Sequence, residues 1–96
     1  MSEQVTISTP DPERVRPLLR SAIQRELGAL DAGIRRTRLQ LAEFENRFDM
    51  TTSDFRRRFD SRELQESLEF LDWWMEATAL ERLTEQRRAL GEARVG

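Results

Sequence analysis

Residues 23–48 read "IQRELGALDAGIRRTRLQLAEFENRF", and one set of side chains recurs there at alternating steps of four and three. All but one member of the set are apolar: Ile23, Leu27, Leu30, Ile34, Thr37, Leu41, Phe44 and Phe48. This is the heptad spacing of a coiled-coil seam, in which one face of a long helix packs against another helix. We therefore predict a helix over about residues 17–48 that requires a second helix beside it.

The partner helix is predicted further along the same chain, over about residues 63–93, with Ser61 as a possible cap. Between the two long segments, the stretch "DMTTSD" (49–54) breaks the periodicity, and Thr51 is placed to cap a new helix. A short helix is predicted over about residues 53–60, with Phe55 and Phe59 one turn apart. The predicted fold class is all-α, a long antiparallel coiled-coil-like hairpin with a short intervening helix.

The N-terminal residues differ in character from the rest of the chain. We predict a flexible arm over residues 1–12 and a single helical domain over residues 13–96. The sequence "TPDP" (9–12) is typical of a helix start, but Pro17 cannot donate the backbone hydrogen bond of a helix interior. The first turn is therefore expected either to be kinked at Pro17 or to begin near it, and the helix is placed from about residue 17.

Composition excludes most catalytic chemistry. The 96 residues contain no cysteine and no histidine, and all 16 basic residues are arginine. Disulfides, imidazole acid–base catalysis, Cys/His zinc sites and Schiff-base lysines are therefore excluded. We expect no enzymatic activity, no cofactor and no metal. The chain also lacks an apolar run long enough to span a membrane and begins with a polar segment, so a cytoplasmic protein is expected.

The predicted last helix is apolar on two opposed sides. One side is expected to face the first long helix and carries Leu64, Leu68, Leu71, Met75 and Ala79, continued by Leu83 and Leu90. The opposite side carries Phe70, Trp73, Ala77 and Leu80, with Trp74 between the two sides. A two-helix hairpin covers only one side. The short helix, a second copy of the chain or a different protein must therefore cover the other.

Charge is distributed unevenly around this helix. Residues 63–81 contain six carboxylates and no arginine, whereas the stretch just before them holds a possible basic patch, Arg56, Arg57, Arg58 and Arg62. An acidic, aromatic-rich helix suits docking on a basic protein surface. The predicted partner-binding residues are Phe70, Trp73, Trp74 and Leu80 for packing, and Glu69, Asp72 and Glu76 for charge.

Two stretches carry a family resemblance, "FENRFDMTTSDFRRRF" (44–59) and "LEFLDWWMEATALERL" (68–83). Together they resemble a widespread class of small, uncharacterised prokaryotic helical proteins, over about residues 41–83. That class combines an aromatic residue, a Met-Ser/Thr turn, a short helix and an acidic Trp-containing helix. The resemblance implies an antitoxin-like partner of a small toxin. The family usually has a glycine after the short helix, where this chain reads Ser61-Arg62-Glu63.

The function predicted from these patterns is a non-enzymatic protein–protein interaction module. Its most specific form is an antitoxin-like neutralising subunit that binds a basic partner through the acidic, aromatic-rich helix. One alternative is a structural homodimer that closes into a four-helix bundle. Another is nucleic-acid binding through Arg56–Arg58, which the net negative charge of the chain disfavours.

Overall fold

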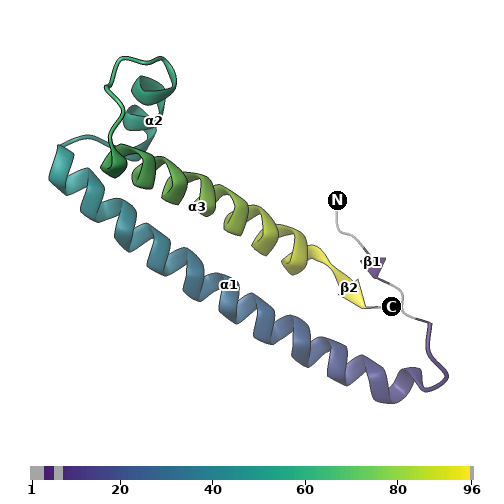
Figure 1. Ribbon diagram of the computed structural model, residues 1–96. Coiled ribbons are helices and arrows are strands. Elements are labelled where there is room, and N and C mark those ends of the chain that lie inside the picture. Colours follow the sequence, from purple (N-terminus) through teal and green to yellow (C-terminus); the bar gives the residue numbers. More distant parts are fainter. Residues whose placement is uncertain (1–3, 6–7, 96) are drawn as a thin grey trace.

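The computed structural model describes residues 4–5 and 8–95 and has the form of a long helical hairpin (Figure 1). Its helices are α1 (Pro12–Phe48), α2 (Thr52–Asp60) and α3 (Leu68–Glu92). The long helices α1 and α3 lie side by side, and α2 sits at the end where they are joined. The molecule measures 58 × 22 × 20 Å. The predicted all-α hairpin with a short intervening helix is confirmed.

The two ends of the chain meet beside the hairpin. Strand β1 (Gln4–Val5) pairs in parallel with β2 (Arg94–Val95), with Gln4 opposite Arg94 and Val5 opposite Val95. Two residues of the predicted arm are thus paired with the C-terminal segment. The other arm residues 1–3 and 6–7, and the C-terminal residue 96, lie outside the described residues.

Helix α1 begins five residues earlier than predicted. Asp11 is its N-cap, and Pro12 occupies the first turn, where the missing N–H of proline costs nothing. Pro17 lies inside the helix. It removes only one backbone hydrogen bond close to the helix start, so a start at residue 17 is wrong.

Helix α3 begins five residues later than predicted. Its N-cap is Ser67, whose hydroxyl accepts a hydrogen bond from the backbone N–H of Phe70 at 3.1 Å. Ser61, the cap that the sequence suggested, instead ends α2. Arg62 then takes a left-handed conformation (φ 63°), and the backbone N–H of Glu63 bonds to the carbonyl of Arg58. The left-handed Arg62 and this hydrogen bond end the short helix, so residues 61–67 connect α2 to α3.

Polar pairs along the hairpin show that α1 and α3 run antiparallel. Arg47 Nη1 on α1 lies 2.9 Å from Glu69 Oε2 near the start of α3. Sixteen residues before Arg47 on α1, Asp31 Oδ1 lies 3.0 Å from Nε of Arg87, which is eighteen residues after Glu69 on α3. As residue numbers fall along α1, their neighbours on α3 rise, as an antiparallel hairpin requires.

The predicted seam of α1 faces α3. Its central members Leu30, Ile34, Thr37 and Leu41 are buried, and the remaining members are half-buried. Gly33 is also buried, beside the Leu83 side chain. The periodicity therefore identified the packed face of this helix correctly.

The prediction for α3 is wrong, because the opposite side of the helix packs inward. Trp73 is fully buried and Ala77 is buried, whereas Leu68 and Met75 are 82% and 63% exposed. Leu71 is exposed as well. The other members of the expected seam, Leu64, Ala79, Leu83 and Leu90, are half-buried. The large tryptophan ring takes the interior position because it removes more apolar surface from water than the leucines would.

An aromatic core lies where the three helices meet. The Trp73 ring stacks on Phe55 of α2 with ring centres 3.9 Å apart, and on Phe44 of α1 at 5.5 Å. Its indole N–H donates to the hydroxyl of Thr52 at 3.1 Å, which satisfies the polar atom of a buried ring. Phe48 and Phe70 close the cluster.

Candidate protein-interaction surface

Helix α2 packs on the Trp73 side of α3, which also contacts α1. Phe55 is fully buried against Trp73, and Arg56 of α2 pairs with Glu81 of α3. The Trp74 indole N–H donates to Asp60 at 3.2 Å, and the Arg56 guanidinium lies over the Trp74 ring. Of the three covers that the sequence left open for this side, the short helix is present, and α1 itself packs there as well.

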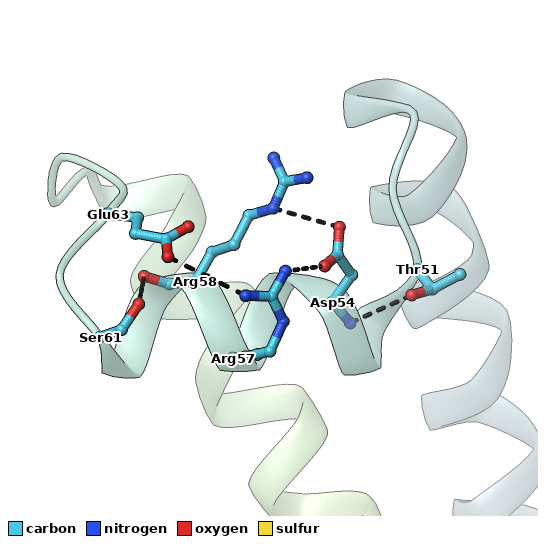
Figure 2. A network of polar contacts seen from close by, with 6 residues as sticks. All are labelled: Thr51, Asp54, Arg57, Arg58, Ser61 and Glu63. Carbon is cyan, nitrogen blue, oxygen red and sulfur yellow. Dashed lines mark hydrogen bonds and ion pairs between the residues drawn. The ribbon is translucent and has the colours of Figure 1, made fainter.

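Helix α2 and its two ends are stabilised by a local polar network (Figure 2). The Thr51 hydroxyl accepts from the backbone N–H of Asp54 at 3.1 Å, which confirms the predicted cap. The Asp54 carboxylate accepts from Arg57 at 2.7 Å and lies 3.2 Å from Arg58. The hydrogen bond from Arg57, assisted by the charges of both arginines, lowers the pKa of Asp54. A carboxylate in the first turn also suits the positive end of the helix dipole.

The possible basic patch is largely paired with carboxylates. Arg56 pairs with Glu81, Arg57 with Asp54 and Glu63, and Arg58 with Asp54. Arg62 is exposed and makes no ion pair with the described residues. A surface whose arginines are already neutralised attracts phosphate weakly. The arrangement therefore gives little support to nucleic-acid binding.

The predicted packing residues belong to the protein's own core. Trp73 is buried within the chain, and Phe70, Trp74 and Leu80 are half-buried and pack against the same cluster. Trp73 therefore offers no surface to a partner. The sequence singled out these residues because of their size and spacing, and the same properties qualify a residue for the core.

The side of α3 turned away from α1 carries an open apolar stripe, which consists of Leu68, Leu71 and Met75. Their spacing of three and four places them on one face of the helix. We name this set the outer stripe. It is the very face that the sequence predicted to pack, and nothing in the described part of the chain covers it.

The sequence signal that was missed is the seam that does pack. It consists of Trp73, Glu76, Leu80, Leu83, Arg87 and Leu90, and two charged members hide its heptad spacing.

Two hollows flank the outer stripe. One, of about 420 Å³, lies between α1 and α3; its lining includes Phe44, Met75, Glu43, Asp72 and Glu76. We call it the Met75 groove. The other, of about 660 Å³, lies between α3 and the α2 connection and is lined by residues that include Leu64, Leu71 and Trp74. The stripe therefore offers both protruding side chains and adjacent depressions.

The predicted charged residues differ in how far they are neutralised. Glu69 pairs with Arg47, and Glu76 lies 2.9 Å from the Gln40 amide nitrogen in the amide orientation that satisfies both groups. Asp72 is exposed and makes no ion pair with any described residue. Glu76 and Asp72 both line the Met75 groove. The groove thus keeps negative charge next to apolar surface.

Two further features are absent from the described part of the chain, a metal-binding cluster and a membrane-spanning helix. No group of three or more acidic side chains among residues 4–5 and 8–95 is arranged to hold a metal ion. None of the helices there is long and apolar enough to cross a membrane.

Comparisons with known proteins add no relative. No family model, no curated protein and no solved structure matches this chain. The resemblance to small prokaryotic helical proteins therefore stays a prediction, and the function has to be argued from the surfaces alone.

Proposed function

We propose that this protein is a non-enzymatic interaction module that binds a partner protein through the outer stripe and the Met75 groove. The observation that supports this proposal is the exposure of Leu68 and Met75 on a helix whose other side packs against α1 and α2. Single exposed leucines are common on proteins. Three large apolar residues in register along one helical face, beside two hollows, are typical of a helix-binding surface.

The charge around the stripe favours a partner with a basic surface. Asp72 and Glu76 line the groove beside Met75, and Glu66 lines the hollow on the other side of α3. An apolar helix flanked by arginine or lysine would bury its apolar side on Met75 and place its charges next to these carboxylates. An antitoxin-like neutralising subunit, as the family resemblance implies, is one protein of this type.

The test uses two substitutions that add the same charge at exposed positions. Met75→Glu places a carboxylate in the stripe, and Ala42→Glu places one on α1 at an exposed residue that lines neither hollow. Both variants should fold, because both sites are exposed. Each variant carries an affinity tag and is expressed in the cells that naturally make the protein. The mass of the purified complex is then measured by size-exclusion chromatography with light scattering.

Met75→Glu should reduce the complex to the mass of one chain, whereas Ala42→Glu should leave it unchanged. Met75 would face the apolar side of the partner helix, so a carboxylate placed there would be buried away from the partner's charges. Such burial costs several kcal/mol, which is enough to release most complexes. If Met75→Glu retains the complex of the unaltered chain, the outer stripe is not the docking surface and the proposal fails.

A further inference from the structure

Charge is segregated between the two ends of the hairpin. Residues 40–81, which contain α2 and the first half of α3, hold eleven carboxylates and five arginines. The opposite end, formed by residues 8–39 and 82–95, holds eleven arginines and six carboxylates. The molecule is therefore an electrostatic dipole along its 58 Å length. We call these the acidic end and the basic end.

The basic end also has an exposed apolar residue, on the part of α1 that reaches beyond α3. Helix α1 extends beyond the last turn of α3 (Figure 1). Leu18, near the start of α1, is 68% exposed. Arg14, Arg16, Arg20 and Arg25 lie around it. At 100° per residue, Leu18 and Arg25 project to the same side of α1 as Glu43 and Arg47, which line the Met75 groove. The basic extension and the groove therefore lie along one face of the molecule.

From these features we propose that the occupant of the Met75 groove is the basic end of a second copy of this chain. Two copies lie side by side and antiparallel, related by a two-fold axis across the middle of α1. Each Leu18 extension then covers the Met75 groove of the other copy. This inference rests on the proposed function, because it names the partner of the same surface.

The lengths of the helices make this arrangement consistent. Leu18 and residue 42 lie equally far from residue 30, the midpoint of α1. The cross-helix contacts Arg47–Glu69 and Gln40–Glu76 place residue 42 level with residue 74 of α3. Full antiparallel overlap of two copies thus sets Leu18 level with Trp74 and Met75 of the second copy. Arg16 and Arg20 become level with Asp72 and Glu76 of that copy.

Charge and area both select the antiparallel, side-by-side arrangement. A parallel pair would place two acidic ends together, and like charges in contact are unfavourable. An end-to-end contact would use a cross-section of only 22 × 20 Å, which is smaller than the roughly 800 Å² that each partner buries in a specific interface. A long side of 58 × 22 Å exceeds that requirement.

Cysteine cross-linking tests the arrangement directly, because the natural chain contains no cysteine. Leu18→Cys and Asp72→Cys are made separately in the full chain, purified, mixed, and treated with a thiol-specific cross-linker about 10 Å long. In the proposed dimer the two introduced residues are level to within two residues, or about 3 Å along the axis. The two copies of residue 18 are about 36 Å apart, since 24 residues of helix separate their levels.

The mixture should yield a covalent dimer that contains one chain of each variant, and Leu18→Cys alone should yield none. Raising the salt concentration from about 0.05 to about 0.5 M should weaken the association roughly ten-fold, because screening reduces attraction between exposed charges. Self-linked Leu18→Cys chains, or no mixed product, would overturn the inference.

The outcome also separates this inference from the proposed function. A purified chain that stays monomeric, together with a cellular complex that Met75→Glu disrupts, would leave the docking surface intact and disprove the second copy as its occupant. A purified dimer that Met75→Glu does not affect would disprove both. Ala42→Glu again serves as the control with equal added charge, and it should dimerise as the unaltered chain does.

Discussion

The two ends of this hairpin differ in how completely they bury apolar side chains. At the acidic end three helices surround Trp73 and Phe55, and both side chains are fully buried. At the basic end only two helices meet, and their contact is made by Leu30, Ile34 and the small residue Gly33. A large aromatic side chain is therefore fully buried only at the end where a third helix packs against the other two. Two helices alone leave most seam residues half-exposed.

The largest expected effect comes from removing the centre of the three-helix end. Trp73→Ala should lower the free energy of unfolding by about 3–5 kcal/mol, because the cavity cannot be refilled by its rigid aromatic neighbours. A urea titration followed by circular dichroism measures this loss. Trp74→Ala is the matched control, with an expected loss of about 1 kcal/mol, since Trp74 is half-buried and bonds to an exposed carboxylate. Equal losses for the two variants would contradict the described core.

A smaller loss is expected from the cap of α2. Thr51→Ala removes the hydroxyl that accepts from the Asp54 backbone N–H and should cost about 1 kcal/mol. Thermal unfolding gives the value. Ser53→Ala, at an exposed position in the first turn of the same helix, should change stability by less than about 0.5 kcal/mol. If the two substitutions have the same effect, Thr51 is not the cap.

At the two-helix end the expected change is a gain of stability. Gly33→Ala should add about 0.5–1 kcal/mol, because alanine favours the helix and its Cβ would meet Leu83 at an ordinary contact distance of 3.6 Å. Gly28→Ala meets nothing within 4 Å and should give a similar gain. Urea midpoints of the two variants compare them. A loss at residue 33 with a gain at residue 28 would mean that the helices pack more closely than described.

The smallest effect concerns pH and is confined to α2. The folded-state pKa of Asp54 lies below its ordinary value of 3.8, so its ion pairs stabilise the protein above that pH. This contribution is lost as the pH falls through the folded-state pKa. The difference in urea midpoint between the unaltered chain and Asp54→Asn should therefore shrink below about pH 4. A difference that stays constant from neutral to strongly acidic pH would contradict the role of this carboxylate.

The sequence predicted the first long helix better than the second, for a physical reason. Along α1 one apolar face recurs without a competitor, so its buried residues were predictable from spacing. Helix α3 has two apolar sides, and local spacing cannot rank them. The choice depends on Phe55 and on the register of α2, which are contacts between segments far apart in the chain. Glu76 and Arg87 further hid the true seam, since each is accommodated there by a polar partner on α1, Gln40 and Asp31.

The starts of the two long helices were missed by about five residues, and for α3 the reason is related. Ser61 and Ser67 are both competent caps by sequence, and the left-handed turn at Arg62 decides between them. For the candidate site, the acidic residues around α3 were predicted, but the exposed apolar residues were assigned to the core. Trp73, which was predicted to contact a partner, lies in the core, and the outer stripe, which was predicted to pack in the core, is exposed. A partner surface can be recognised only after the core has been assigned.

The central claim is that the open face of α3 binds the basic end of a second copy, and the solution mass of the purified chain tests it most directly. Sedimentation equilibrium at low salt should give twice the mass of one chain for the unaltered protein and for Ala42→Glu. Met75→Glu should give the mass of one chain. A purified, unaltered protein with the mass of a single chain at every concentration would contradict the claim.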